Sequence, residues 1–393
     1  MKKPITVAIY SGVSKSTTFI ERLIKGLIES HVKVLVFGVD NGKSFYSESV
    51  KYYTYRGKVN KLFRLCKYTL LLSLFKPKDK KRLDEIIKAN THEPKYLLRL
   101  KYYPVLFYKP DIFHLQWAKS IEDWVWVQEF GMKLVVSLRG THITISPIGN
   151  DYWADLYTHL FPQVDGFHAV SKSMSLEAQK YRALPSKIKI IYSGLLLDDM
   201  MFLPKTVKKE PLKILSVGRS HWTKGYHHAL DAMKLLKERH IYFHYTIIGV
   251  DDDEELLFQR SQLDIENDVT FKSELPFEAV LKSIQAVDVL LLPSLEEGIA
   301  NVVLEAMALG TLVVSTDCGG MDEVIKDKEN GFLIPIRNPS EMASAIQNVS
   351  QLTLDDYSKL TKAARVSIEQ QHHIKKMIVD MKALYHGVLN DKL

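Results

Sequence analysis

Cysteine is scarce in this chain of 393 residues, which contains only Cys66 and Cys318, so a disulfide framework is excluded. Two free thiols fit a reducing compartment, and we expect the protein in the cytoplasm. No apolar run approaches the roughly 18 residues that span a bilayer. The N-terminal segment begins with two lysines, but its short apolar run ends in Ser-Gly, which predicts a first strand and not a signal peptide.

The positive charge of the chain is also not evenly distributed along the sequence. The net charge is +7, yet segment 51–109 holds sixteen Lys and Arg against four Asp and Glu, a net +12, so the remainder carries −5. A protein that binds nucleic acid over its whole surface would not be charged this way. The sequence predicts one basic face and no nucleic-acid partner.

Strand-like and helical segments alternate in both halves of the chain. ITVAIYSG, VSKSTTFIERLIKGLIES and VKVLVFG predict a strand, a helix and a strand, and a second alternating series begins with KILSVG. Because the chain exceeds what one core usually holds, we expect an α/β protein with two Rossmann-like domains facing each other across a cleft. The predicted parts are an N-terminal domain (1–196, with a basic insertion at about 51–109), a linker (197–212), a C-terminal domain (213–370) and a terminal helix (371–393) that can cross back to the N-terminal domain.

The stretch Ser294–Gly310 predicts a ligand site in the second series. It follows VDVLLLP, a run typical of a strand buried on both faces. Glu297 and Gly298 predict a turn, and Asn301 is expected to cap the helix NVVLEAMAL, which ends at a glycine. Amides at a helix N-terminus suit a phosphate, and Glu297 and Glu305 place carboxylates on either side of it.

A second loop, Gly218–Gly225, joins the first strand of this series to its helix. Arg219 and Lys224 supply fixed positive charge for a diphosphate, and the glycines let backbone approach a ligand. The alternative is a solvent-exposed basic turn. A further flexible loop is predicted at 319–320.

Two loops of the first half follow strands. Loop 11–18 is small and polar and contains Gly12, but it lacks a dinucleotide-binding spacing. It predicts either a capped turn or a ligand-facing loop. The second loop places Arg139 and His142 at a strand's carboxyl end, where His142 could be structural or catalytic.

The basic segment interrupts the alternation of strands and helices. VNKLFRLCKYTLLLSLF predicts a helix with Lys61, Arg64 and Lys67 on one face. One interpretation is a core helix with a solvated lysine-rich rim. Another is a patch that contacts anionic membrane, where each basic residue near the surface adds about 1 kcal/mol. Nucleic acid is a third.

The whole second half resembles the retaining glycosyltransferases of family 4, which have the GT-B fold. The matching pieces lie within 213–335: VGRSHWTKG, VDVLLLPSLEEGIANVVLEAMALGTLVVST, GGMDEVI and NGFLIP. In the first half, HLQWA and SLRGTH resemble a bacterial polysaccharide-assembly branch. The resemblance implies that a sugar moves from a nucleoside-diphosphate-sugar to a polysaccharide or lipid-linked saccharide acceptor, with retained configuration, in the cytoplasm at the inner face of the cell membrane.

The resemblance also implies roles for single residues. Arg219 and Lys224 would hold the donor diphosphate, with no metal or other cofactor expected. Glu305 would bind the ribose hydroxyls and Glu297 a sugar hydroxyl. His142 completes the catalytic set, although either Arg139 or His142 could occupy the position of the family's first-domain histidine. The substrate-binding positions are Gly12, Arg139, Gly298, Ile299, Ala300, Asn301, Val302 and Glu305.

Some positions depart from the family pattern. Ser273 replaces the usual glycine near the base, so the identity of the base stays open. Asp251–Asp253 is the closest approach to a metal cluster, and we interpret it as a solvated loop and helix cap. Alternatives are a nucleotide-sugar epimerase on the same fold, or a non-catalytic protein that binds a sugar nucleotide or uses its basic surface.

Overall fold

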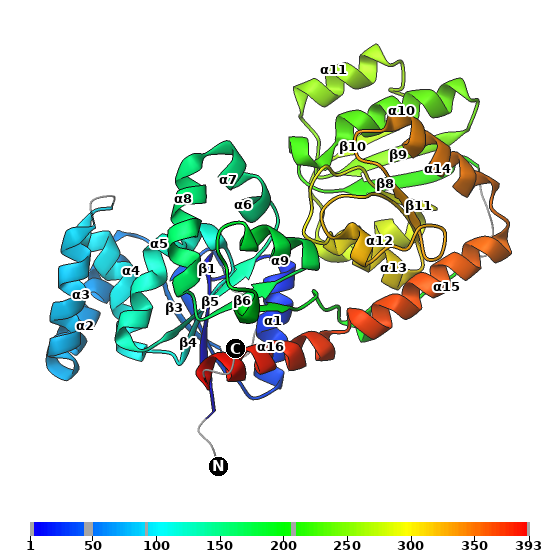
Figure 1. Ribbon diagram of the computed structural model, residues 1–393. Coiled ribbons are helices and arrows are strands. Elements are labelled where there is room, and N and C mark those ends of the chain that lie inside the picture. Colours follow the sequence, from blue (N-terminus) through cyan, green and yellow to red (C-terminus); the bar gives the residue numbers. More distant parts are fainter. Residues whose placement is uncertain (1–3, 43–49, 91–92, 206–209, 391–393) are drawn as a thin grey trace. The chain divides into compact units, whose positions relative to one another are not determined.

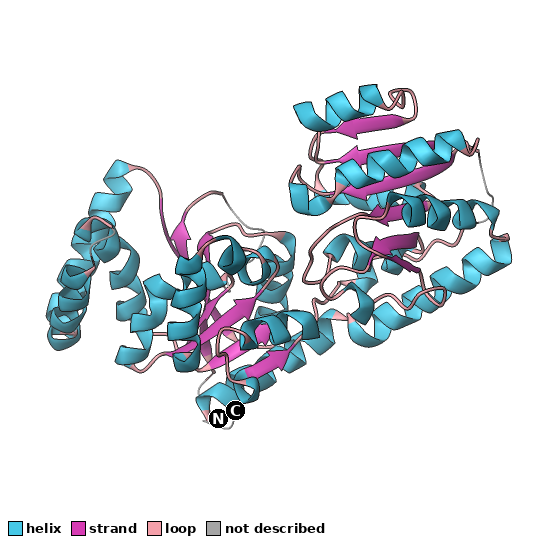
Figure 2. Ribbon diagram, turned by 45° about the horizontal axis from the view of Figure 1, so that its top comes forward, coloured by secondary structure: helices cyan, strands magenta, loops and turns pink. Residues whose placement is uncertain are grey.

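The computed structural model describes residues 4–42, 50–90, 93–205 and 210–390 (Figure 1). The chain forms two compact units. Unit 1 comprises Met1–Val170, Met174–Ile191 and Ile374–Leu393, and unit 2 comprises Ser171–Ser173 and Tyr192–His373. In each unit a parallel sheet is flanked by helices, as Figure 2 shows. The predicted α/β class with two Rossmann-like domains is confirmed.

Unit 1 contains a seven-stranded sheet with the order β3-β2-β1-β4-β5-β6-β7. The paired strands are parallel throughout. The strands are β1 (Thr6–Val13), β2 (Lys33–Val39), β3 (Lys51–Tyr55), β4 (Ile112–Leu115), β5 (Lys133–Leu138), β6 (Gly166–Ala169) and β7 (Ile188–Ile190). The sequence did not predict β3, which lies at the start of the basic segment.

The helices of unit 1 include one from the end of the chain. Helix α16 (Ile374–Leu389) packs on α1 (Thr18–Glu29), where a Cβ at Gly26 would contact Ile378 (Figure 1). The other helices are α2 (Lys58–Phe75), α3 (Pro77–Ala89), α4 (Lys95–Tyr108), α5 (Ile121–Trp124), α6 (Thr141–Thr144), α7 (Ser146–Gly149), α8 (Asp151–Leu160) and α9 (Lys172–Gln179), which has residues in both units.

Unit 2 contains a six-stranded parallel sheet with the order β10-β9-β8-β11-β12-β13. Its strands are β8 (Leu212–Val217), β9 (Phe243–Ile248), β10 (Val269–Lys272), β11 (Val289–Leu292), β12 (Leu312–Thr316) and β13 (Phe332–Ile334). Its helices are α10 (Tyr226–Glu238), α11 (Glu254–Gln262), α12 (Phe277–Ala286), α13 (Asn301–Leu309), α14 (Pro339–Gln351) and α15 (Leu354–Gln371). The predicted alternating series, with its strand in VDVLLLP and its helix in NVVLEAMAL, is confirmed.

Strand β11 shows why its sequence is continuously apolar. Val289 and Leu291 pack into the core on one face of the sheet. Leu290 and Leu292 pack into a second core on the other face. All four side chains are buried, as expected for a central strand of a parallel sheet that has helices on both sides.

The order of strands defines where ligands bind. The chain order reverses between β1 and β4 in unit 1 and between β8 and β11 in unit 2. In open α/β sheets, ligands occupy the crevice outside the carboxyl ends of the strands at such a reversal. The loops after these four strands therefore carry the candidate sites. Within the described residues, no helix combines the length and the apolar character needed to span a membrane.

Candidate functional site

The loops that follow β8 and β11 meet at the strand-order reversal of unit 2. Leu295 N donates a 2.7 Å hydrogen bond to Thr223 O. Gly225, with φ of +64°, lies so close to the second loop that a Cβ there would overlap Pro293 O. Glycine is required at this position by both its backbone conformation and the close approach. The two loops are thus held together through their backbones.

The side chains of these loops form an ion pair. Lys224 Nζ lies 2.6 Å from Glu297 Oε1, and the Ser294 hydroxyl donates to the same oxygen at 3.0 Å. Arg219 is exposed at the start of its loop, and no ion pair involves it in the described part of the chain. Burial, followed by the charges of Arg219 and Lys224, lowers the pKa of His221. The Gly218–Gly225 loop is therefore electropositive.

Helix α13 begins next to this ion pair. The prediction that Asn301 is its N-cap was wrong. The N-cap residue is Ala300, and Asn301 is the first helical residue. Since alanine has no capping oxygen, the first amides receive no side-chain cap. The Asn301 Oδ1 atom is buried and has no hydrogen-bond partner in the described residues. The helix ends at Gly310, in the left-handed conformation, as predicted.

The other predicted residues of this stretch differ in their exposure. Gly298, Ile299 and Ala300 are buried at the helix entry, and Val302 is partly exposed. Glu305 is only 6% exposed, on the second turn of α13. A carboxylate this deeply buried requires polar partners.

The glycine loop after β12 packs against the same turn. Gly320 N donates to Gly298 O at 3.1 Å. A Cβ at Gly319, whose φ is +60°, would overlap Glu297 O. The two glycines thereby let this loop pack directly against the backbone of the turn that contains Glu297. Burial raises the pKa of the neighbouring Cys318 to about 12, so its thiol is protonated at neutral pH.

In unit 1, Gly12 lies in a strand and not in the predicted loop 11–18. Strand β1 continues to Val13, and its register with β2 shifts between Ile9 and Gly12. Gly12 has φ of +90°, and a Cβ on the opposite Gly38 would overlap its carbonyl oxygen. Gly12 thus forms an irregularity at the end of β1, where two backbones approach closely.

The structure places both candidates for the first-domain catalytic position after β5. His142 lies on α6, which begins at Thr141, so it belongs to a helical turn and not to a loop as predicted. Its ring stacks on Trp117, with centroids 5.1 Å apart. The Arg139 guanidinium lies over the Phe19 ring at 4.6 Å. The side chains of Arg139 and His142 are thus each held against an aromatic ring.

Sequence reasoning missed a buried hydrogen-bond chain behind this position. His168 Nε2 lies 3.0 Å from Ile191 O and must donate to it. Each neutral ring then accepts at Nδ1: Ser137 Oγ donates to His168 Nδ1 at 2.9 Å and accepts from His114 Nε2 at 2.9 Å. The Tyr385 hydroxyl of α16 donates to His114 Nδ1 at 2.8 Å. The sequence feature that could have indicated this chain is a polar residue inside each of three apolar strands.

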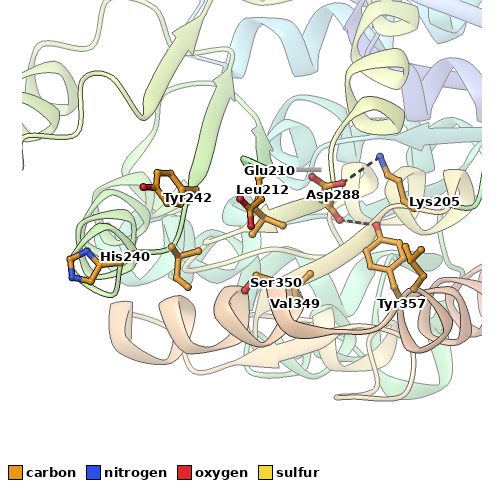
Figure 3. Close-up of a pocket in the computed structure, with 11 residues that line it drawn as sticks. Lys205, Glu210, Leu212, His240, Tyr242, Asp288, Val349, Ser350 and Tyr357 are labelled. Carbon is orange, nitrogen blue, oxygen red and sulfur yellow. Dashed lines mark hydrogen bonds and ion pairs between the residues drawn. The ribbon is translucent and has the colours of Figure 1, made fainter. Parts of the chain in front are cut away.

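A cavity of about 430 Å³ lies at the other end of the unit 2 strands (Figure 3). Its lining includes Leu212 and Asp288, at the amino ends of β8 and β11. Lys205 Nζ lies 3.9 Å from Asp288, and Tyr357 donates a 2.7 Å hydrogen bond to the Asp288 carbonyl. These polar groups already pair with one another. We therefore place the candidate site at the carboxyl ends of the strands and not in this cavity.

The acidic stretch 251–253 lies where α11 begins. Asp253 caps α11 by accepting from Leu256 N at 3.1 Å, which confirms its assignment as a helix cap. Across the residues that the structure describes, no three His, Cys, Asp or Glu side chains cluster as metal ligands would.

The chain is similar to known glycosyltransferases. Residues 202–367 match the family model described as "Glycosyl transferases group 1". The chain is 29% identical over 285 residues to the putative colanic acid biosynthesis glycosyltransferase WcaL of Escherichia coli (strain K12), covering 70% of this chain and 69% of that protein. It is 30% identical over 250 residues to the amylovoran biosynthesis glycosyltransferase AmsK of Erwinia amylovora, covering 62% of this chain and 61% of that protein.

Solved structures share the whole fold. Sucrose-phosphate synthase from Thermosynechococcus elongatus has a TM-score of 0.77 at 16% identity, with 98% of this chain and all of that chain covered. Anabaena Alr3699/HepE in complex with UDP-glucose has a TM-score of 0.73 at 16% identity, covering 97% of this chain and 100% of that chain. The fold is that of GT-B glycosyltransferases. The chain is thus similar to the group 1 glycosyltransferase model over residues 202–367 and to two glycosyltransferases named for polysaccharide biosynthesis.

Proposed function

We propose that the protein is a retaining glycosyltransferase of family 4 that moves a sugar from a nucleoside-diphosphate-sugar to a saccharide or lipid-linked acceptor in polysaccharide assembly. The Lys224–Glu297 ion pair, next to Arg219 at the strand-order reversal of unit 2, carries this proposal. The UDP-glucose complex of a protein with the same fold supports a nucleotide-sugar donor. The names of WcaL and AmsK support a role in polysaccharide biosynthesis.

Unit 2 holds the donor in this proposal. Arg219 and Lys224 bind the diphosphate, and amides at the start of α13 add partial positive charge. Glu305 accepts hydrogen bonds from the ribose hydroxyls. As the bond between the sugar and the diphosphate breaks, negative charge grows on the diphosphate, and the two fixed cations stabilise it. No metal is needed for this step.

Glu297 binds a sugar hydroxyl and is not the nucleophile. Its Oε1 atom already accepts from Lys224 and Ser294, which lowers the nucleophilicity of the carboxylate. The acceptor hydroxyl instead attacks the anomeric carbon from the face that the diphosphate leaves. The bond to the diphosphate breaks, and the hydroxyl proton passes to the leaving phosphate oxygen. Configuration is retained, which NMR of the product's anomeric proton tests; an inverted product would refute this step.

Unit 1 binds the acceptor in this proposal. Arg139 and His142 supply polar groups at the carboxyl end of β5, and Gly12 leaves room at the end of β1. His142, held by its stacking on Trp117, is the catalytic member of this group.

Helix α2 supports a peripheral contact with anionic membrane. Tyr68 and Leu72 are buried in the core of unit 1, whereas one face of the helix exposes apolar side chains to between 60 and 84%. We define this exposed set as the α2 stripe. Lys61, Arg64 and Lys67 lie on the same helix, and Lys67 and Lys58 flank the stripe. An exposed apolar stripe with basic neighbours is typical of a helix lying in a membrane interface. The stripe consists of Val59, Leu62, Phe63, Leu70 and Leu74.

A thermal-shift screen of the purified protein against UDP, GDP, ADP and their sugars tests the donor. We expect one base to be preferred. A ligand at 100 times its dissociation constant stabilises the folded state by about 2.7 kcal/mol, so the shift in melting temperature is large enough to measure. If none of these ligands raises the melting temperature, the proposal is wrong. An NMR time course with the donor alone would distinguish an epimerase, which changes the sugar without an acceptor.

A further inference from the structure

Arg139, at the carboxyl end of β5, forms no ion pair within the described residues. Its Nη2 donates to Gln116 Oε1 over a long 3.4 Å, and its guanidinium otherwise rests on the Phe19 ring. No carboxylate forms an ion pair with it among the described residues. The Arg139 Nε atom is buried there without an acceptor. Charges that leave water are normally paired or hydrogen-bonded, so this arrangement calls for a missing partner.

Gln116 adds a second unmatched donor at the same place. The residue follows β4 and is 0% exposed. Its Oε1 accepts from Arg139, but its Nε2 has no acceptor within the part of the chain that the structure describes. Almost all buried polar groups in folded proteins are hydrogen-bonded. Two buried donors, on residues joined by a hydrogen bond, therefore lack an acceptor among the described residues, and one of them belongs to a charged group.

The neighbouring groups do not balance this charge. Burial and the adjacent His168 and Arg139 lower the pKa of His114, and burial and Arg139 lower that of His168, so both rings are neutral. The Phe19 ring under the guanidinium carries no charge, and it contacts Trp117 edge-on at 6.0 Å. A sugar hydroxyl would satisfy the donors but leave the charge unpaired, whereas an oxyanion satisfies both.

We propose that Arg139 and Gln116 bind the oxyanion of an acidic saccharide, either a uronate carboxylate or a sugar phosphate. This inference rests on the proposed function and names its substrate class. Arg139 is half-buried, and burial lowers the pKa of its guanidinium to about 9, so the group is still protonated at neutral pH. The guanidinium fork matches the geometry of carboxylate and phosphate oxygens, and the Gln116 amide supplies a further donor.

Calorimetric titration of the whole protein with glucose, glucuronate and glucose 6-phosphate tests the inference. The screened nucleotide is kept saturating so that Arg219 and Lys224 are occupied. We expect at least one acidic sugar to bind about tenfold or more tighter than glucose, equivalent to about 1.4 kcal/mol. Preference for glucuronate identifies a carboxylate, and preference for glucose 6-phosphate identifies a phosphate. If neither acidic sugar binds tighter than glucose, the inference is wrong.

The variant Arg139→Gln should lose this preference. Arg82→Gln is the matched control, since Arg82 is an exposed arginine of unit 1 that pairs with Glu129 at 2.8 Å. The control should keep the preference. A preference that survives in Arg139→Gln overturns the assignment. Nucleotide binding should be unchanged in Arg139→Gln, so failure of the donor site and failure of this subsite are distinguishable.

A second variant keeps the test decisive if Arg139→Gln does not fold. Gln116→Glu introduces a carboxylate within reach of Arg139 and so supplies the missing counter-ion from inside the protein. We expect a higher Tm for the free protein and loss of the preference for acidic sugars. A lower Tm together with an unchanged preference would overturn the inference.

Discussion

Lys224 and Glu297, 73 positions apart in sequence, are joined by an ion pair of 2.6 Å between the loops after β8 and β11. The pair has two consequences. It orients the ammonium group at the strand-order reversal, and it engages one of the two oxygens of the Glu297 carboxylate. Both consequences follow from the meeting of the two loops through the Gly225 and Leu295 backbones.

Replacing Lys224 tests its role as a fixed cation. In Lys224→Met, we expect kcat to fall by about 100-fold or more, which is the usual loss when one preorganised charge-stabilising group is removed. Steady-state kinetics with the donor chosen by the screen measures it. The matched control is Lys359→Met, which removes an exposed lysine of α15 that pairs with Asp355 at 2.8 Å. A near-native kcat for Lys224→Met would show that this ammonium does not assist departure of the diphosphate.

Two glycine variants separate backbone strain from steric overlap. Gly319 and Gly131 both have positive φ, but a Cβ overlaps Glu297 O only at Gly319 and meets nothing within 4 Å at Gly131. Alanine at Gly131 should cost about 1–2 kcal/mol for the left-handed backbone alone. Gly319→Ala should cost more and should also weaken nucleotide binding, because it displaces the Glu297 turn. Urea unfolding and calorimetry measure both effects. Equal losses of stability with unchanged nucleotide affinity would contradict the role of this loop.

The α2 stripe predicts a loss of membrane binding without a loss of fold. Changing Leu62, Phe63 and Leu70 to serine should reduce co-sedimentation with anionic vesicles at least tenfold. Because these side chains are exposed, each change should alter the free energy of unfolding by no more than about 0.5 kcal/mol. Val379→Ser, an equally exposed position on α16, serves as control.

The basic residues of α2 provide an independent arm of the membrane test. Changing Lys61, Arg64 and Lys67 to glutamine removes three charges, each contributing about 1 kcal/mol near an anionic surface. Vesicle binding should therefore fall by roughly 100-fold, while binding of the nucleotide is spared. Unchanged co-sedimentation of both sets of variants would remove the membrane contact from the account.

The buried histidines predict a dependence of stability on pH. Burial lowers the pKa of His168 to about 3 and that of His372 to about 4, and His114 shifts in the same direction. The unfolded chain then binds more protons below about pH 6.5, so the stability is fully present above that pH and is lost as pH falls. The slope can reach about 1.4 kcal/mol per pH unit for each histidine. Urea unfolding between about pH 7.5 and 5 avoids most carboxylate titration, and a flat profile would contradict the buried neutral chain.

Local sequence signals predicted the framework of the site. The run VDVLLL has the length and apolarity of a central strand, and the glycine at 310 ends α13 as expected. The N-cap was placed one residue late because Asn301 is a favoured capping residue, whereas the chain enters the helix at Ala300. Strand β3 was missed because its sequence, KYYTY, begins with a lysine, is rich in tyrosine and resembles the rest of the basic and aromatic segment.

The polar interior of unit 1 could not be predicted in the same way. His114, Ser137 and His168 come from three strands, and their side chains meet only because β4, β5 and β6 pair in a particular register. Gln116 likewise became a candidate site residue only through its hydrogen bond with Arg139, which follows a different strand. Contacts of this kind depend on the tertiary structure, and no spacing within one segment indicates them.

The most direct test of the central claim is calorimetric titration of the preferred nucleoside-diphosphate-sugar into the wild-type protein and into the double variant Arg219→Gln, Lys224→Gln. We expect saturable one-to-one binding to the wild type. The double variant should bind at least about 100-fold more weakly, equivalent to about 2.7 kcal/mol. Equal affinity of the two proteins would contradict the claim that these cations hold the donor diphosphate.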